Sequence, residues 1–482
     1  MTEALLAALV FLPLLGACLL LLAPSSWRAT ILLAVTVPLP FCLLPLTLLI
    51  ADAGLFEMTL AGHPAPLGIR WRLDALSLLI LWLNVSLMIL VGLAAGARFA
   101  PASDVGLRFW PLWLLLAGGI HALLLSADLF NLYVTLELVT LAGIGLIATG
   151  GSGAALRAAM RYLLLALMAS LLYLLGVGLV YAEAGTLDLY QLGETLEPGL
   201  LPATALVLML AGLLVKSAIF PLHAWLPAAH GNAPGPVSAM LSAIVVKVSL
   251  YIIWRLWFWT AGDWQLPAPG LLLGLLGAGA ILYGSALALV QKRLKMVVAY
   301  STVAQLGYLM LIFPLSGLLA WQAASYHLIA HGLAKAALFV AAGNILASLG
   351  SDRLRRLAGL DQRLPMDVFA LALASVSLMG LPPSGGFVGK WLFLRAAYEQ
   401  NAWGWMALVA LGGLLAAAYL FRVLALTCFH PRSHGHSTRL REPPTLASLA
   451  GLLLALAAIA LGFASAPILA LLEAAWPGAM TP

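Results

Sequence analysis

The feature that most constrains this chain is the recurrence of long apolar runs along its whole length. A helical run of about 20 residues, rising about 1.5 Å per residue, can cross the roughly 30 Å of hydrocarbon in a bilayer. Of the 482 residues, 63% are hydrophobic and only 9% are charged, against roughly 25% charged in an average soluble domain. The 45 glycines and 27 prolines fit membrane helices better than soluble ones. The sequence therefore predicts an all-α integral membrane protein and excludes a water-soluble globule.

Turn signals and charged residues divide the chain into fourteen predicted spans. The leader before the first span is MTEA, with an acid and no basic residue, so we interpret this span as a retained helix and not as a signal peptide. The cysteines (Cys18, Cys42 and Cys428) all lie within spans, which argues against a disulfide framework or a cysteine metal site. The predicted spans cover residues 4–23, 29–51, 74–97, 110–127, 129–149, 158–182, 203–229, 236–259, 270–291, 296–318, 320–349, 366–398, 404–428 and 445–472.

Two of these spans are interrupted. The seventh contains VKSAIFPLHAWLPAAH, in which Pro221 and Pro227 each remove a backbone donor. The twelfth carries five helix-breaking residues close together: Gly380, Pro382, Pro383, Gly385 and Gly386. Broken helices in matching positions indicate the ion path of a transporter, because unwound backbone in a membrane must line a cavity.

The positions of the breaks predict an internal duplication. Spans four to eight and nine to thirteen form two blocks of five, and the broken span is the fourth of each block. Because five is odd, the second block is inverted relative to the first. We therefore predict three N-terminal helices in 1–109, a first repeat in 110–259, an inverted second repeat in 260–428, and a loop with the last helix in 429–482.

Basic residues between the spans predict the orientation. One set of loops and helix ends carries sixteen of them, including Arg98, Lys292 and Lys295, whereas the other set carries Arg70, Arg72, Arg255 and Arg395. Cytoplasmic loops of membrane proteins are enriched in Lys and Arg, so both termini are expected to be extracytoplasmic. The net charge of +6 is then explained by orientation, and we predict no nucleic-acid partner.

Seven ionisable residues stand out inside the predicted spans. Within HLIAHGLAKAALF, two histidines and a lysine recur every four residues and therefore share one helix face. Charged groups in hydrocarbon are costly, and they usually mark ion or proton paths. Burial lowers the pKa of a lysine and a nearby carboxylate raises it again, so such a lysine can carry a proton near neutral pH, as can imidazole. The predicted proton relay consists of Glu137, Lys216, Lys247, His327, His331, Lys335 and Lys390.

Other readings of the polar residues are weaker. Satisfied polar packing groups would be the usual interpretation of one lone histidine, but seven ionisable groups are expensive to bury. GGFVGKW lacks the residues of a phosphate-binding loop. His430, His434 and His436 in FHPRSHGHSTR could hold a metal, although a solvated loop explains them as well. No haem, flavin, iron–sulfur or nucleotide signature occurs, so we predict no cofactor and no metal.

With these residues the sequence resembles the antiporter-like subunits of respiratory complex I and of multisubunit Mrp cation/proton antiporters. The resemblance covers nearly the whole chain and implies fourteen helices with inverted repeats. It also implies a midplane relay in a bacterial inner membrane protein. In that picture Glu137 pairs with Lys216, protons pass through Lys247 and the eleventh helix, and Lys390 ends the chain.

Within that family the chain is most similar to the Mrp D subunit. DLFNLYV and Lys390 carry this similarity, whereas VTLELVT departs from the expected pattern. The departure leaves open a diverged branch that serves membrane-bound hydrogenases or carbon-uptake complexes. The resemblance implies other membrane subunits as partners, with protons and monovalent cations as cargo.

Three functions follow from these observations. The first is an ion-transport subunit, not itself an enzyme, of a Na⁺ or K⁺/proton antiporter. The second is a proton-pumping subunit of a redox-driven complex of the complex I type. The third is a membrane scaffold, which the buried charges oppose.

Overall fold

The computed structural model describes residues 1–261, 264, 267–428 and 442–476. His430, His434 and His436 lie outside the described residues, as does the C-terminal Pro482. The described α-helices are α1 (Thr2–Leu22), α2 (Arg28–Thr36), α3 (Pro38–Ala53), α4 (Ala75–Gly96), α5 (Asp104–Leu125), α6 (Leu129–Ala148), α7 (Gly153–Ala184), α8 (Leu189–Thr195), α9 (Leu200–Lys216), α10 (Leu226–Asn232), α11 (Gly235–Met240), α12 (Val246–Arg255), α13 (Pro267–Val290), α14 (Leu294–Leu309), α15 (Leu318–Leu349), α16 (Pro365–Met379), α17 (Gly385–Glu399), α18 (Trp403–Cys428), α19 (Thr445–Ala460) and α20 (Ser465–Ala474).

Short turns and one small sheet complete the described elements. The strands β1 (Leu55–Thr59) and β2 (Arg70–Asp74) form an antiparallel pair. Short 3-10 turns are η1 (Ser25–Trp27), η2 (Leu60–Gly62), η6 (Met310–Ile312) and η7 (Leu354–Arg356), and the π-helical segments are η3 (Leu241–Val245) and η4 (Leu256–Thr260).

The helices account for the fourteen predicted spans. In the described part of the chain, eleven helices are long and apolar enough to cross a membrane, and α19 with α20 makes a twelfth that is bent by 71°. The shorter apolar helices α9 and α16 begin the two spans that were predicted to be broken. The bend between α19 and α20 is a feature that the sequence analysis did not predict.

The two breaks have local causes. After α9, Ala218 adopts a positive φ of 53°, and Pro221 lies in the link to α10. After α16, Gly380 has a φ of 82°, and a Cβ there would lie 2.7 Å from Cδ of Lys390. Glycine is favoured at such a position because it has no side chain to clash. Ser384 then caps α17 by accepting a hydrogen bond from the Phe387 amide at 3.2 Å.

A repeated backbone pairing supports the inverted repeats. At the start of α6, Leu129 donates to the Leu187 carbonyl at 2.9 Å, and Leu189 donates to Ala127 at 2.8 Å. At the start of α14, Leu294 donates to Asp352 at 2.7 Å, and Leu354 donates to Lys292 at 3.0 Å. The partners have the same spacing in both cases. Five spans separate the two pairings, so they lie at opposite ends of the bundle, as an inverted repeat predicts.

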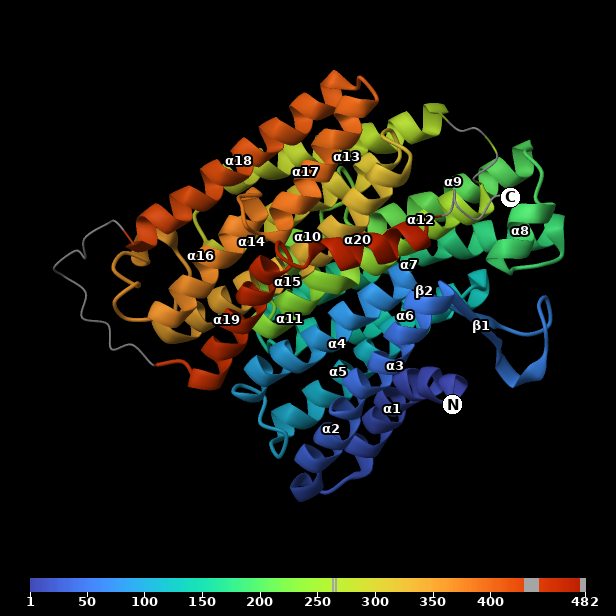
Figure 1. The fold of residues 1–482 in the computed structure, drawn as a ribbon. Coiled ribbons are helices and arrows are strands. Elements are labelled where there is room, and N and C mark those ends of the chain that lie inside the picture. The colour runs from blue at the N-terminus through green and yellow to red at the C-terminus, as the bar shows by residue number, and fades with distance from the viewer. Residues whose placement is uncertain (262–263, 265–266, 429–441, 477–482) are drawn as a thin grey trace.

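The two ends of the bundle differ in their charged groups. We call the end with β1, β2 and α8 the hairpin end, at the right of Figure 1. The opposite end, where Arg98 follows α4 and Lys292 precedes α14, is the basic end; the start of α19 lies there. At the hairpin end, Arg70 pairs with Asp188 at 3.0 Å, which ties β2 to the residue that caps α8.

A buried ion pair fixes the hairpin to the helices. Asp74 ends β2 and caps α4 by accepting from the Ser77 amide at 3.0 Å. Its carboxylate also accepts two hydrogen bonds from Arg255, at 2.6 and 2.8 Å. Burial alone would raise the pKa of Asp74, but the Arg255 guanidinium, the Ser77 amide and the charge of Arg72 together outweigh burial and lower the pKa to about 2. Arg255, expected in a loop or at a helix end, is thus a fully buried structural group.

Candidate functional site

Glu137 lies on α6, whose start is defined by its cap. Asp128 precedes α6 and accepts a hydrogen bond from the Asn131 amide at 2.6 Å. Two turns further along, the Glu137 carboxylate accepts from the Ser170 hydroxyl on α7 and from the Lys216 ammonium on α9. The predicted pairing of Glu137 with Lys216 is thus present in the structure.

Lys216 is the last residue of α9, directly before the break. Its side chain is only 2% exposed, whereas that of Glu137 is 17% exposed. The Lys216 ammonium also donates to the Thr140 hydroxyl at 3.1 Å. A cation is favoured at the C-terminal end of a helix, where carbonyl groups lack partners. The broken helix therefore supplies a second stabilising effect besides the carboxylate.

Lys247 occupies a different environment on α12. It closely follows the π-helical segment η3, and its ammonium donates to the Ala243 carbonyl at 2.6 Å. π-helical segments interrupt the regular helix ladder and occur frequently at functional sites. Lys247 is fully buried, and among the described residues it has no carboxylate partner.

The predicted face of α15 is present and buried. The rings of His327 and His331 lie nearly parallel, with centroids 5.9 Å apart, and none of their nitrogens has a hydrogen-bond partner among the described residues. One turn further along, Lys335 donates to the Ser301 hydroxyl and, at 2.9 Å, to the Val298 carbonyl. Buried polar atoms are nearly always satisfied by protein or ordered water, so the two rings mark positions where water is expected to enter.

Lys390 lies on α17 and reaches back across the second break. Its ammonium donates to the carbonyls of Leu378 at 2.7 Å and Met379 at 3.1 Å, which end α16. It also lies 5.1 Å from the centroid of the Tyr308 ring. Lys390 thus binds the carbonyl end of α16, which carries partial negative charge, whereas Lys216 binds a carboxylate.

The structure gathers the seven predicted residues into two groups, with a gap between them. His331 lies within electrostatic range of Lys247, Lys335 and Lys390. Lys216 interacts with Glu137, but in the described part of the chain no hydrogen bond joins Lys216 to Lys247. The two groups are therefore a Glu137–Lys216 pair and a cluster on α12, α15 and α17 that also includes His327.

Lys295 and His230 are among the buried ionisable residues that the sequence analysis misplaced or missed. Lys295 was assigned to a basic loop, but it is 1% exposed and donates to the Ala233 carbonyl. His230 on α10 is fully buried, and its ring lies 4.6 Å from that of Phe339. A lysine in the first turn of a helix is unfavourable for the helix dipole. This signal could have identified Lys295 as a residue held there by other contacts.

Partners of the relay residues were also missed. Ser170 and Thr140 on the first repeat and Ser301 on the second are hydroxyl groups in apolar helices, and nothing in the sequence distinguishes them from packing residues. Within the described ranges, no group of three His, Cys, Asp or Glu side chains could hold a metal ion.

Comparison with known proteins identifies a family. A family model described as "NADH:quinone oxidoreductase/Mrp antiporter, TM" matches residues 126–416. NADH-quinone oxidoreductase subunit N of Desulforudis audaxviator is 37% identical over 370 residues, which are 76% of this chain and 74% of that protein. The D subunit of the Na⁺/H⁺ antiporter of Bacillus subtilis is 30% identical over 374 residues, which are 77% of this chain and 75% of that protein.

Solved structures share the fold over nearly the whole chain. A chain of the Mrp complex from Dietzia sp. matches with a TM-score of 0.88 at 25% identity, covering 98% of this chain and 96% of that chain. A chain of the membrane-bound sulfane sulfur reductase, an archaeal respiratory membrane complex, matches with a TM-score of 0.89 at 26% identity and the same coverage. Both structures are multisubunit membrane complexes, which indicates that this chain has other membrane subunits as partners.

Proposed function

Because this chain belongs to the family of antiporter-like membrane subunits shared by NADH:quinone oxidoreductases and Mrp antiporters, we propose that it is the proton-translocating subunit of a multisubunit cation/proton antiporter. The exchanged cation is monovalent, Na⁺ or K⁺. The relative from Bacillus subtilis and the Mrp complex from Dietzia sp. support this assignment. The observation that carries it is the Glu137–Lys216 ion pair at the end of the broken helix.

The ion pair acts as the switch of the relay. Two opposite charges about 4 Å apart at an effective dielectric of about 20 attract by roughly 4 kcal/mol, which holds both groups charged in the bilayer. A proton or cation arriving at Glu137 weakens this attraction. Lys216 is then free to release its proton toward Lys247.

The remaining residues pass the proton on. Since no hydrogen bond joins Lys216 to Lys247 in the described residues, this transfer requires a chain of water molecules. From Lys247 the proton reaches Lys335 and the histidines of α15, which lie within electrostatic range of Lys247 and Lys390. Lys390 receives it at the break between α16 and α17, where the backbone carbonyls of α16 hold its charge.

A second candidate function is supported by specific relatives. The 37% identity to NADH-quinone oxidoreductase subunit N and the match to the sulfane sulfur reductase complex favour a proton pump driven by redox chemistry in partner subunits. The same relay would serve both functions. They differ in the partner subunits and in what drives the protons.

The test is to purify the complex through a tag on this chain and identify its subunits by mass spectrometry. Proteoliposomes with the complex and an imposed proton gradient should collapse that gradient on addition of Na⁺ or K⁺, whereas the chain alone should not. Proton movement only on oxidation of an electron donor, with iron–sulfur or quinone-binding partners, would support the second candidate. A complex that moves protons under neither condition contradicts both.

The proposed orientation is that both termini are extracytoplasmic, so the basic end faces the cytoplasm. The excess of basic residues at that end supports it. A reporter fused within the loop 351–363 should then be cytoplasmic, and one fused after Pro482 should be extracytoplasmic. The opposite result at either position would contradict the orientation.

A further inference from the structure

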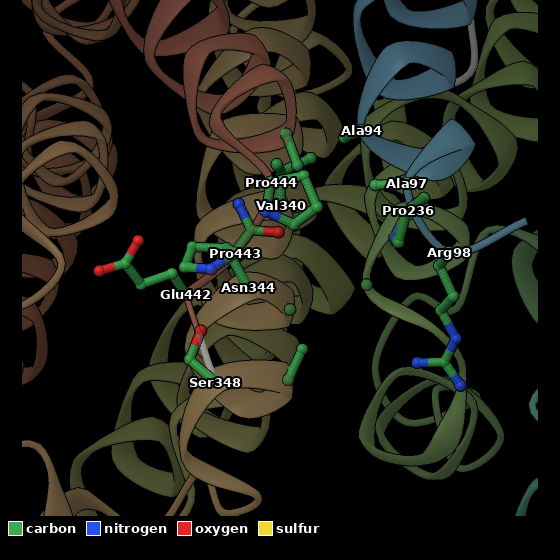
Figure 2. A pocket seen from close by; sticks show the side chains of 14 residues that line it. Ala94, Ala97, Arg98, Pro236, Val340, Asn344, Ser348, Glu442, Pro443 and Pro444 are labelled. Carbon is green, nitrogen blue, oxygen red and sulfur yellow. The ribbon is translucent and has the colours of Figure 1, made fainter. Parts of the chain in front are cut away.

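Two cavities adjoin each other at the basic end, and the relay uses neither of them. The first, of about 470 Å³, lies between the end of α4, the last turns of α15 and the residues that precede α19 (Figure 2). The second, of about 550 Å³, lies among α2, α4 and α5. Ala97 and Pro444 line both cavities, so the two are direct neighbours that share part of their lining. Volumes of roughly 300–1,000 Å³ are typical of small-molecule sites.

Two exposed residues of opposite charge lie at the two sides of the first cavity. Figure 2 shows Arg98 on one side and Glu442 on the other. Among the described residues neither side chain forms an ion pair. The Ser348 hydroxyl also lines this cavity, is buried, and has no hydrogen-bond partner in the described part of the chain. The cavity therefore offers one cationic, one anionic and one neutral polar group to a ligand.

The second cavity is apolar and has the depth of one leaflet. It is lined mainly by aliphatic and aromatic side chains, among them Leu33, Ile89, Leu93 and Trp110. It follows α4 from Met88 to Ala97, which is roughly 14 Å of helix at about 1.5 Å per residue. That length is close to half of the roughly 30 Å hydrocarbon thickness of a bilayer.

We propose that the two cavities together bind one phospholipid whose zwitterionic headgroup carries a phosphate and an ammonium, as in phosphatidylethanolamine. An acyl chain lies in the apolar cavity, the phosphate faces Arg98, and the ammonium faces Glu442. Charged residues of both signs line the first cavity, which suits a headgroup that bears both signs. A purely anionic headgroup would satisfy Arg98 but would place no cation beside Glu442.

The position of this lipid indicates its role. The apolar cavity is lined by α2, α4 and α5, and the first cavity is lined by α4, α11, α15 and the start of α19. The bound lipid thus joins the N-terminal helices to α15, which carries the relay cluster, and to α19. It acts as a structural ligand at the seam between these parts of the bundle.

A pair of glycine variants tests the acyl site. Gly96 lines the apolar cavity, and a Cβ there meets no atom within 4 Å, so Gly96→Leu is expected to extend a side chain into the cavity. Gly178 on α7 is exposed and has equally open space, so Gly178→Leu is the matched control outside the cavity. The tagged complex is purified in mild detergent, and lipids that remain bound are quantified by mass spectrometry.

The wild-type complex and Gly178→Leu are expected to retain about one phosphatidylethanolamine per chain, and Gly96→Leu at least fivefold less. Equal retention by the two variants would overturn the site. Absence of retained lipid in the wild type, with Gly96→Leu weakening binding of a partner subunit, would also overturn it, because the cavity would then be a protein interface.

A second experiment tests the headgroup assignment. The complex is exchanged into nanodiscs with equal amounts of phosphatidylethanolamine and phosphatidylglycerol and then re-extracted. The wild type should retain the ethanolamine lipid preferentially, and Glu442→Gln should reduce that preference at least about threefold, the scale of an exposed ion pair. Arg98→Gln should lower retention of both lipids. A wild type without preference, or a preference unchanged in Glu442→Gln, would contradict the assignment.

Discussion

The two repeats share a backbone plan but place different polar groups at corresponding positions. The helices α7 and α15 have the same length, 32 residues, and each ends in a left-handed glycine, Gly185 and Gly350. In this register Ser170 of α7 corresponds to Lys335 of α15. Ser170 donates to the Glu137 carboxylate, whereas Lys335 donates to the Ser301 hydroxyl. In the first repeat, a hydroxyl at this position donates to a carboxylate. In the second repeat, an ammonium at the corresponding position donates to a hydroxyl.

The lysines at the two broken helices also differ in their binding partners. Lys216 at the end of α9 pairs with a carboxylate, while Lys390 binds only backbone carbonyls and an aromatic ring among the described residues. The first repeat therefore contains a pair whose charges cancel, and the second contains lysines without a described carboxylate partner. In the proposed relay, the first repeat would therefore act by making and breaking a pair, and the second would pass protons among lysines that have no described carboxylate partner.

The largest expected effect is that of Lys216→Ala. It leaves the Glu137 carboxylate without its ammonium, and an uncompensated buried charge costs about 3–5 kcal/mol, so Glu137 is expected to take up a proton permanently. Cation-dependent collapse of a proton gradient should fall to background in inverted vesicles, measured by fluorescence dequenching. Lys390→Ala should retain partial activity, because water can satisfy the carbonyls of α16. Equal loss in both variants, with normal subunit levels by immunoblot, would break the comparison.

The next largest effect is expected at a buried pair that does not switch. Asp74→Asn leaves Arg255 buried without its carboxylate and should lower the free energy of unfolding by about 3–5 kcal/mol. Glu57→Gln is the control, because the Glu57–Arg72 pair is partly exposed and contributes less than about 1 kcal/mol. Thermal unfolding of the purified complex measures both. Proton flux per intact complex should not change, and a selective loss of flux in Asp74→Asn would place this pair in the relay.

The pH dependence of the Asp74 pair has a definite sign. Its pKa of about 2 in the folded chain lies below the value of about 3.9 in an unfolded chain. The stabilisation is therefore complete above about pH 4 and is lost as the pH falls toward 2. The difference in melting temperature between wild type and Asp74→Asn should be constant from pH 6 to 8, and a difference that varies over that range would contradict this assignment.

A smaller effect is expected when the second repeat is given the charge pattern of the first. Ser301→Asp places a carboxylate beside Lys335, which should hold the lysine charged and slow release of its proton. Dequenching rates should fall about tenfold, the factor that roughly 1.4 kcal/mol of extra barrier produces. Ser301→Ala removes the hydroxyl without adding charge and should have less effect. Similar rates in the two variants would show that a carboxylate at this position does not trap the proton.

The smallest effect is expected for Ser170→Ala. It removes one hydrogen bond to Glu137 and leaves the Lys216 contact in place, and a net hydrogen bond contributes about 0.5–1.5 kcal/mol. Dequenching should fall about threefold, and Thr140→Val, which removes the second hydroxyl at the pair, should behave alike. A complete loss in Ser170→Ala would mean that the hydroxyl itself carries the proton.

The span pattern and the main charged pair could be predicted because their signals are strong and local. Hydrophobic runs and Gly/Pro clusters identify the membrane spans and both breaks, and Glu137 and Lys216 stand out in apolar sequence. The bend between α19 and α20 has no such signal, since AIALGFASAPI contains one glycine and one proline in an otherwise uniform run. A single helix was therefore the natural expectation.

Other features depended on tertiary contacts that a sequence does not display. Lys295 lies next to basic loop residues in the chain, yet it is buried because its ammonium reaches Ala233 near the start of α11. Arg255 was assigned by its charge to a loop or helix end, because its partner Asp74 lies far away in the sequence. Counting basic residues between the spans does not distinguish a residue in a loop from a buried residue that forms an ion pair.

The central claim is that the Glu137–Lys216 pair is the switch, and Glu137→Gln tests it most directly. Glutamine keeps the size of the side chain and can still accept from Ser170, but it carries no charge to hold Lys216. Cation-dependent dequenching in inverted vesicles should be abolished while the complex assembles normally, and Glu137→Asp should keep partial activity because the charge remains at a slightly greater distance. Near-normal dequenching from a fully assembled Glu137→Gln complex would show that the glutamate is structural and would contradict the mechanism.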